Sequence, residues 1–391
     1  MAEWQTVRLG EIVKTNQSTY SPKENWQFVN YLDTGNITMN KIDEIQNINT
    51  AKDKLPSRAR RKVKTNSIIY STVRPNQLHY GIIKKQPDNF LVSTGFTVID
   101  VNYDKAVPDF IYYALTKQEV TEQLQAIAEQ SVSAYPSLKP SDIENLELML
   151  PDKKTQERIV AILRSIDEKI KENNAINNNL EQQAQALYEN IFCIHSDIDT
   201  KHISLSDLMD YAGGSQPPAS EFVFSERDGY IRFVQIRDYD TDSHITYIPD
   251  SPKNKLCEEH DIMIARYGAS LGRICFGING AYNVALAKVF PKKSFFREFL
   301  RCYLSSRTFY EGINNKGGRS AQAGFNQSDI NSFEIDFPVD ETIVKKFECT
   351  VAPMFEQRLQ LKKENQHLAS LRNTLLPKLM SGELDVSNVE I

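Results

Sequence analysis

The sequence predicts a protein of mixed α/β (α+β) class, built as two tandem domains that are each followed by a long helix. A chain of 391 residues is long enough for two or three domains. One short stretch occurs twice, as PSDIENLELMLP at Pro140–Pro151 and as QSDINSFEIDFP at Gln327–Pro338, with an offset close to half the chain. Each copy is followed by a segment whose apolar residues have the spacing of a helix.

The bulk composition is typical of a soluble globular protein, with 40% hydrophobic and 25% charged residues. The first ten residues, MAEWQTVRLG, lack the charged-then-apolar pattern of a signal peptide. No apolar run approaches the roughly 20 residues that a membrane span needs. The five cysteines form no C-x-x-C pair, which favours reduced structural thiols in a cytoplasmic protein without membrane contact.

The two halves also correspond upstream of the repeated stretch. Short alternating or β-branched runs bounded by Gly, Pro, Asn and Asp predict strands and turns. The corresponding runs are VRLGEIV (7–13) with ISLSDLM (203–209), YLDTGNI (31–37) with FVQIRDY (233–239), and NSIIYSTVRP (66–75) with HDIMIARYGA (260–269). The sequences between these anchors differ, which suggests one scaffold that presents two different surfaces.

Apolar residues in the segment after Pro151 recur in steps of four and three, the pattern of a helix that pairs with another helix. Two asparagines lie on this seam, where they either fix the register of the pair or face a solvent gap or a partner surface. The segment after Pro338 is less regular, and Pro353 should start or kink its main helix, which Pro377 and Gly382 should end. The predicted seam residues are Ile159, Leu163, Ile166, Ile170, Asn173, Asn177, Leu180 and Leu187, then Leu368, Leu371 and Leu375.

The chain has a net charge of −5, and residues 1–150 hold equal numbers of basic and acidic residues. Neither value indicates a domain that binds nucleic-acid phosphates through its overall charge. One local stretch, AKDKLPSRARRKVK (51–64), is strongly basic and contains a single acid, Asp53. Such a run is either a solvated face or a local footprint for nucleic acid. Its basic residues are Lys52, Lys54, Arg58, Arg60, Arg61, Lys62 and Lys64.

Further candidates for DNA contact follow the predicted strands, because Arg, Asn and Gln side chains read base edges with paired hydrogen bonds. The loops at 129–140 and 314–327 directly precede the two copies of the repeated stretch and differ in composition, as expected for two sites that read different sequences. The candidates are Arg74, Asn76, Gln77 and His79 in the first half, and Arg266, Tyr267, Ser270, Arg273, Lys316, Arg319, Gln322 and Asn326 in the second.

Motifs for catalysis are missing from the sequence. It contains no G-x-x-x-x-G-K-[ST] loop, no G-x-G-x-x-G after a strand, and no Asn or Asp before a Pro-Pro-aromatic run. The six histidines are scattered, and Pro87-Asp88 is not followed by the E-x-K of a nuclease. The Asp-rich stretch at 237–244 lacks the Gly and the terminal Glu of a calcium loop. We therefore expect no catalytic residue and no metal site in this chain.

Two stretches carry a resemblance to a known family. LRNTLLPKLMSGELDV (371–386) and LKPSDIENLELMLPDKKTQERIVAIL (138–163) resemble the C-terminal signature and the central junction of the specificity subunits of type I restriction–modification systems. The resemblance implies two target-recognition domains, a pseudo-two-fold repeat and two long antiparallel helices between the domains. The implied bounds are 1–151 for the first domain, 152–196 for its helix, 197–338 for the second domain and 339–391 for its helix.

The same resemblance implies the partners of the chain. Each domain would read one half of a split double-stranded DNA target, and the helices would dock two methyltransferase subunits and, with them, restriction and translocase subunits. S-adenosylmethionine, ATP and Mg would bind to those partners, and this chain would hold no cofactor. Two other classes stay open: a coiled-coil adaptor without a DNA role, and a self-contained restriction nuclease.

Overall fold

The computed structural model describes residues 4–130, 136–194, 198–242, 244–317 and 324–389. The chain divides into two compact units, of which the first contains Met1–Ile170 with His367–Ile391 and the second contains Lys171–Gln366. Both long helices therefore contribute to both units. Across the described residues, none of the helices combines the length and the apolar character that crossing a membrane requires.

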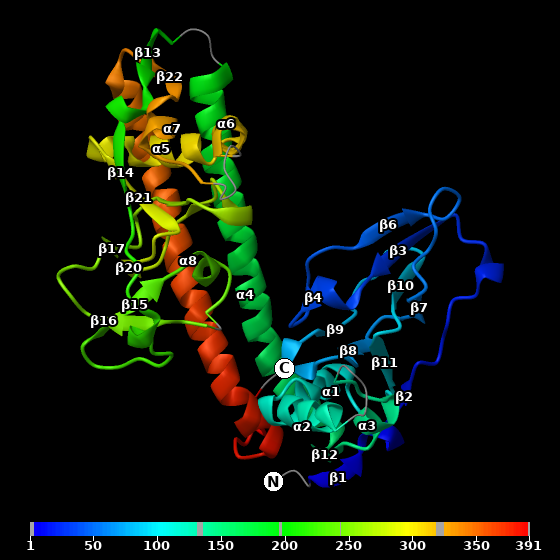
Figure 1. Cartoon of the computed structure of the whole chain (residues 1–391). Helices are drawn as coiled ribbons and strands as arrows, with labels where there is room; N and C mark the ends of the chain where they lie inside the picture. The colour runs from blue at the N-terminus through cyan, green and yellow to red at the C-terminus, as the bar shows by residue number, and fades with distance from the viewer. Residues whose placement is uncertain (1–3, 131–135, 195–197, 243, 318–323, 390–391) are drawn as a thin grey trace. The chain divides into compact units, whose positions relative to one another are not determined.

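Each half has a run of strands, then three short helices, a closing strand and a long helix, so the order of elements repeats as predicted (Figure 1). The first unit contains β1 (Gln5–Arg8), β2 (Val13–Thr15), β3 (Phe28–Leu32), β4 (Ile37–Thr38), β5 (Lys41–Ile42), β6 (Gln46–Asn49), β7 (Ala59–Lys62), β8 (Ile68–Ser71), β9 (Tyr80–Ile82), β10 (Phe90–Ser93), β11 (Phe96–Val101), α1 (Pro108–Leu115), α2 (Gln118–Glu129), α3 (Pro140–Glu144) and β12 (Glu147–Leu150). The second unit contains β13 (Thr200–Ser204), β14 (Met209–Gly213), β15 (Tyr230–Val234), β16 (Tyr247–Pro249), β17 (Leu256–Cys257), β18 (Met263–Ala265), β19 (Ile274–Cys275), β20 (Gly280–Tyr282), β21 (Leu286–Pro291), α5 (Arg297–Leu304), α6 (Arg307–Gly317), α7 (Gln327–Asn331) and β22 (Glu334–Pro338).

Sheet topology shows that the two units are copies of one fold. The first unit has four-stranded sheets of order β2-β11-β8-β9 and β6-β3-β10-β7, and the second has β14-β21-β18-β19 and β16-β15-β20-β17. The parallel pair β3–β10 recurs as β15–β20 in the equivalent place, while the other pairs within these four sheets are antiparallel. The mixed α/β prediction and the internal repeat are both confirmed.

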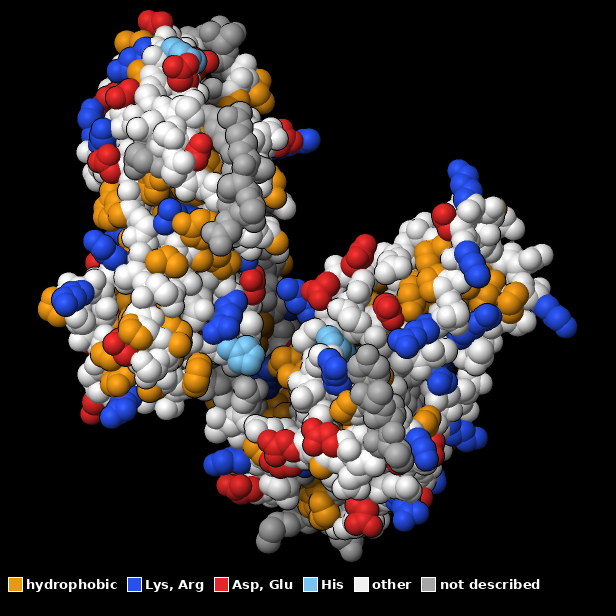
Figure 2. Space-filling view, viewed as in Figure 1, with side chains coloured by type: hydrophobic (Ala, Val, Ile, Leu, Met, Phe, Trp, Pro, Cys, Tyr) orange, Lys and Arg blue, Asp and Glu red, His pale blue; other side chains and the backbone are white. Residues whose placement is uncertain are grey.

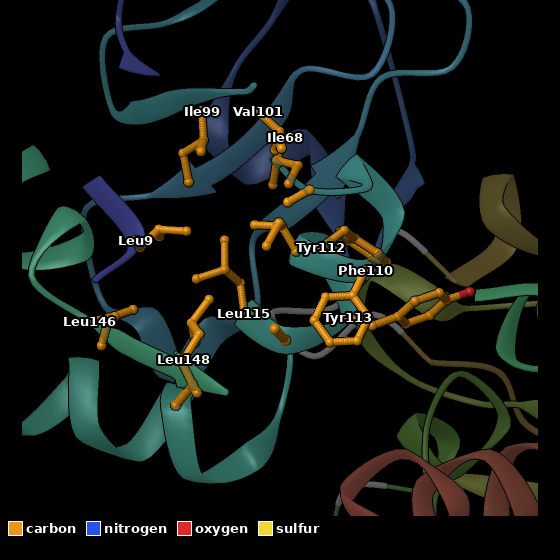
Figure 3. Packing of buried hydrophobic residues seen from close by; sticks show 14 of the residues in the cluster. Leu9, Ile68, Ile99, Val101, Phe110, Tyr112, Tyr113, Leu115, Leu146 and Leu148 are labelled. Carbon is orange, nitrogen blue, oxygen red and sulfur yellow. The ribbon is translucent and has the colours of Figure 1, made fainter. Parts of the chain in front are cut away.

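The repeated stretch closes the base of each unit, and this role explains why it occurs twice. Strand β12 pairs with β1, and β22 pairs with β13. The backbone N–H of Leu9 donates to the carbonyl of Leu146, and that of Leu205 donates to the carbonyl of Phe333, both at 2.8 Å. In the close view of the first core, Leu146 and Leu148 lie with Leu9 beneath residues of the sheet and of α1 (Figure 3). The alternating apolar residues are thus the core-facing side of a closing strand.

The two long helices are α4 (Lys153–Tyr188), of 36 residues, which continues as a π-helical stretch over Glu189–Ile194, and α8 (Glu341–Ser381), of 41 residues. In the second unit, Glu181 of α4 pairs with Arg358 of α8 at 2.9 Å, and Asn173 donates to Glu364 at 3.0 Å. From one contact to the next, the residue number rises along α4 and falls along α8, so the two helices run antiparallel in that unit. In the first unit, Asp167 of α4 pairs with Arg372 of α8 at 2.8 Å.

Part of the predicted seam is buried. Ile159, Leu163 and Ile166 are buried, and Asn173 is fully buried, with its amide donating to both Glu364 and Asn365. Asn173 therefore faces α8 and not a solvent gap. The remaining seam residues are half-buried, namely Ile170, Asn177, Leu180, Leu187, Leu368 and Leu375.

The structure differs from two expectations about the second helix: Leu371 does not lie at the helix contact, and the helix does not start at Pro353. Leu371 is 39% exposed, because the neighbouring Arg372 takes the contact position beside Asp167. The helix begins at Glu341 and continues through Pro353, since Val351 and Phe355 on either side are buried in the core of the second unit. Burial of such residues outweighs the roughly 3 kcal/mol that an interior proline costs.

The end of the second helix is predicted only in part. Pro377 lies inside α8, whereas Gly382 directly follows its last residue with φ +78°. That left-handed conformation is the usual reason for a glycine at a helix end.

Candidate nucleic-acid interface

In each unit, the loop after one core strand meets the segment that precedes the repeated Ser-Asp-Ile stretch. In the first unit, Val73 pairs with Ser137, and the backbone N–H of Arg74 donates to the carbonyl of Pro136 at 3.2 Å. In the second unit, Tyr267 pairs with Gly324. Two separate stretches that the sequence marks as DNA candidates therefore lie together in each unit, at equivalent places of the repeated fold.

The loop Arg74–His79 of the first unit is held in an uncommon backbone conformation. Arg74 (φ 48°) and Leu78 (φ 57°) flank a 3-10 turn over Pro75–Gln77. The side chains of Asn76 and Gln77 are exposed, while the backbone N–H of Asn76 donates to Oε1 of Gln125 at 3.2 Å. Non-glycine residues at positive φ concentrate at functional sites, where the surrounding structure enforces them. The loop presents two amide side chains on a fixed backbone.

His79, one of the base-reading candidates, makes an internal contact through one ring nitrogen. Its ring nitrogen Nδ1 lies 2.6 Å from the carbonyl oxygen of Ile37, to which it donates. The ring is half-buried, and Nδ1 also lies 3.4 Å from Oγ1 of Thr38. These contacts attach the loop to the β4–β5 hairpin.

The turn at Thr94–Gly95 connects Arg58 to the strand end that leads into the loop Arg74–His79. The N–H of Thr94 donates to the carbonyl of Arg58 at 2.9 Å, and the N–H of Thr72 donates to the carbonyl of Gly95 at 2.8 Å. Burial alone would raise the pKa of Asp33, but hydrogen bonds from Thr34, Tyr31 and Ser93 and the charge of Arg58 together lower it. Arg58 itself is exposed and keeps its guanidinium at the surface beside the turn.

Three other basic residues of 51–64 are paired with an acid or partly buried. Lys62 pairs with Glu24 and lies 5.1 Å from the Trp26 ring centre. Arg61 is half-buried, and burial lowers the pKa of its guanidinium. Lys64 lies 3.6 Å from Asp100.

The remaining three basic residues of this stretch are less constrained. Lys52 and Lys54 are exposed, while Arg60 is half-buried and its Nε donates to the Ser57 carbonyl at 3.4 Å. On the visible face of the first unit, basic side chains are spread among acidic and apolar ones (Figure 2).

In the second unit, Arg266 and Tyr267 form a stacked pair. The Arg266 guanidinium lies 5.1 Å from the Tyr267 ring centre, and its Nη1 donates to the carbonyl of Val284 at 3.4 Å. A Cβ at Gly324 would lie 2.5 Å from the Tyr267 ring, so only glycine fits beside it. Tyr267 is 39% exposed. An exposed aromatic ring backed by a guanidinium is suited to stacking on a base or lying against a sugar.

Other candidates of the second unit are committed to internal contacts. Arg273 donates to both carboxylate oxygens of Asp240, at 2.9 and 2.6 Å, so an internal partner already neutralises its charge. Asn326 caps α7, because its Oδ1 accepts from the N–H groups of Ser328 and Asp329. Arg273 and Asn326 therefore make internal contacts that sequence spacing could not reveal.

Four further positions complete the second unit's candidates. Ser270 is half-buried, and its carbonyl accepts from the N–H of Arg273 at 2.9 Å. Lys316 lies in the last turn of α6, and its side chain is outside the described part of the structure, as are Arg319 and Gln322.

Metal-site geometry is absent from the part of the chain that the structure describes: no group of three or more His, Cys, Asp or Glu side chains could hold an ion there. The two units instead present differing loops on a common fold.

The repeated fold is also recognised when the sequence is compared with known protein families. The family model described as type I restriction modification DNA specificity domain matches residues 1–182 and again residues 198–352, once for each half.

The chain belongs to this family of DNA specificity proteins. It is accordingly a specificity subunit of a type I restriction–modification system, the non-catalytic component that recognises DNA. Two curated relatives resemble it over most of their length. It is 25% identical to the type I restriction enzyme HindI specificity subunit of Haemophilus influenzae, covering 98% of this chain and 100% of that one.

The second relative is the type I restriction enzyme MjaIX specificity subunit of Methanocaldococcus jannaschii. It is 26% identical, over 79% of this chain and 76% of the relative. Among solved structures, the S subunit of a type I restriction–modification system from M. genitalium has a TM-score of 0.59 at 16% identity, covering 97% of this chain and 96% of that one. That likeness supports the fold of the specificity subunit.

Sequence reasoning missed one part of this specificity subunit, the β4–β5 hairpin. Its turn residues Met39 and Asn40 both have positive φ, at 48° and 66°. The stretch ITMNKI carries only a weak signal, an Asn between short alternating runs. Strands of two residues lie below the length at which periodicity is informative.

Proposed function

We propose that this specificity subunit reads a bipartite, asymmetric double-stranded DNA target, one half with each recognition domain. The domains are residues 1–151 and 197–338, and the helical segments 152–196 and 339–391 separate the half-sites and dock two methyltransferase subunits. Restriction and translocase subunits join through that assembly. The observation that carries the proposal is one topology occurring twice with different exposed side chains at equivalent loops.

The amide and aromatic side chains are proposed to make the base contacts. Asn76 and Gln77 in the first domain are exposed amides, which pair bidentately with adenine in the major groove. Tyr267 in the second domain offers an exposed ring next to the Arg266 guanidinium. Because these side chains differ in chemistry, the two domains are suited to different half-sites.

The exposed basic residues are proposed to contact phosphates. Arg58 lies at the turn beside the Asn76 and Gln77 loop, and Lys52 and Lys54 are exposed on the same chain segment. Phosphate contacts fix orientation and carry no sequence information. With a net charge of −5, the partner subunits are proposed to supply much of the contact with the DNA backbone.

Catalysis belongs to the partners in this proposal. The donor S-adenosylmethionine would bind to the methyltransferase subunits, and ATP and Mg to the restriction subunits. The contribution of this chain is to bind and orient the target so that the partner reaches the correct base.

A methylation assay tests the proposal. The purified chain alone should transfer no labelled methyl group from S-adenosylmethionine, and the chain with its methyltransferase should methylate DNA that carries both half-sites. DNA with either half-site scrambled should be a poor substrate. Equal methylation of intact and scrambled DNA would favour the coiled-coil adaptor, and cleavage or methylation by the chain alone would favour a self-contained enzyme.

A further inference from the structure

The β-hairpin Ile37–Ile42 distinguishes the first domain from the second. Strands β4 and β5 pair Ile37 with Ile42 and Thr38 with Lys41, and Met39 and Asn40 form the turn. Both turn residues have positive φ, which is the signature of a type I′ turn. Asn adopts this conformation readily, but Met does so at a cost of roughly 1 kcal/mol or more. A methionine at this position therefore calls for a reason beyond turn formation.

Hydrogen bonds attach the hairpin firmly to the loop Arg74–His79. The N–H of Met39 donates to the carbonyl of Leu78 at 2.9 Å, and the N–H of Asn40 donates to the carbonyl of Tyr80 at 2.8 Å. The side-chain oxygen of Asn40 accepts from the N–H of Ile82 at 2.9 Å. Together with the bond from His79 to Ile37, these contacts make the hairpin and the loop one rigid surface.

Close packing reinforces that attachment. A Cβ at Gly81 would lie 2.6 Å from Ile37 Cδ1 and 2.8 Å from Asn40 Oδ1, so strand β9 approaches the hairpin as closely as glycine permits. Pre-organised side chains on a rigid backbone are what sequence discrimination requires, because a loose contact fits right and wrong bases alike.

The surface has the shape and chemistry of a major-groove reader. Met39 is 47% exposed at the tip and Ile42 is 38% exposed, while Thr38, Lys41, Asn76 and Gln77 are also exposed. The major groove admits a two-stranded ribbon, and apolar side chains contact the methyl group of thymine there. Amide side chains pair with adenine in the same groove. A tip that offers both chemistries suits A·T base pairs.

The equivalent segment of the second domain follows a different course. There, Asp240 accepts from Arg273, and Asp242 pairs with Arg232 at 2.7 Å. Gln366 of α8 also donates to Asp242 at 3.2 Å. This segment is acidic and attached to the long helix, and within the described residues of the second unit it forms no hairpin. The exposed hairpin is thus a feature added to one copy of a common fold.

We infer that the β4–β5 hairpin and the loop Arg74–His79 form the major-groove reader of the first half-site, with Met39 contacting a thymine methyl group and Gln77 the adenine edge of an A·T pair. The inference rests on the proposed function and deepens it. It predicts that the half-site read by the first domain contains A·T pairs and that Met39 is a specificity-determining residue.

Binding of the assembled methyltransferase complex to synthetic duplexes tests the contact. Replacing each thymine of the half-site by uracil in turn removes only its methyl group. At one position the wild-type complex should bind about fourfold more weakly, as expected for one buried methyl group. The complex with Met39→Ala should be insensitive to that replacement, and Gln77→Ala should relax the choice of base at the adjacent pair in methylome sequencing.

Met149→Ala is the matched control, since Met149 is also an exposed methionine of the first unit, at 44%, but lies on β12. This variant should keep the wild-type response to uracil. Equal uracil responses of wild type and Met39→Ala, or a first half-site without A·T pairs, would overturn the inference while leaving the proposed function standing. Absence of any bipartite motif in the wild type would instead refute the proposed function itself.

Discussion

Lengthening both long helices by one heptad should lengthen the spacer between the two DNA half-sites. Helix α4 passes from the first unit to the second between Ile170 and Lys171, and α8 returns between Gln366 and His367. Insertions at these two points leave the internal contacts of each unit unchanged. Seven helical residues add about 10 Å, which corresponds to about three base pairs of B-DNA. Methylome sequencing of a host that expresses the variant should show the original half-sites with this longer spacer.

A heptad inserted in α4 alone is the control for that experiment. It makes the two helices unequal in length between the units, so the pairs Asp167–Arg372 and Glu181–Arg358 cannot both be kept without distorting the helices. This variant should therefore lose stability and activity without gaining a new spacer. If the double insertion still methylates the original spacer, the helices do not set the distance and the reasoning is refuted.

Four further predictions follow from single residues. Arg58→Ala should make the negative slope of log Kobs against log salt shallower by about 0.9, the value for one phosphate contact, while Arg273→Ala should leave the slope unchanged, as binding titrations at several salt concentrations would show. Arg301 and its partner are both almost fully buried, so Arg301→Met should destabilise the second unit by about 3–5 kcal/mol in chemical unfolding. Burial raises the pKa of Glu348 above its ordinary 4.5, so the neutral carboxyl contributes stability below pH 4.5 and this contribution is lost as pH rises through the raised pKa. Glu348→Gln should therefore raise the thermal unfolding midpoint at neutral pH and not at about pH 4. Asn173→Leu should raise the thermal midpoint, because a buried asparagine on a helix seam lowers stability, and a fall would contradict this account of the seam.

The fold could be predicted because its signals are local and occur twice. Alternating apolar residues at Leu146 and Leu148, and again at Ile335 and Phe337, identify a half-buried strand by its period of two, and all four are buried. The repeat then predicts that whatever the first half builds, the second half builds as well. Pro353 does not mark the start of the second helix, because tertiary packing of α8 overrides a local rule.

The candidate site was less predictable because side-chain partners come from distant parts of the chain. Nothing in a basic run shows that Lys62 pairs with Glu24, and nothing near Arg273 shows that Asp240 holds it in a bidentate pair. The sequence shows where the basic side chains are, but only the folded structure shows which of them form ion pairs with acidic side chains. Exposed side chains such as Asn76 remain as predictions, and the structure adds the hairpin beside them.

The central claim is that one chain reads two different DNA sequences with two copies of one fold. Methylome sequencing of a host that expresses this chain with its methyltransferase, and otherwise lacks type I systems, tests it most directly. The account predicts a motif of two unlike blocks separated by a spacer of fixed length and free sequence. A contiguous motif, a palindrome of identical blocks, or methylation that is unchanged when this chain is omitted would contradict it.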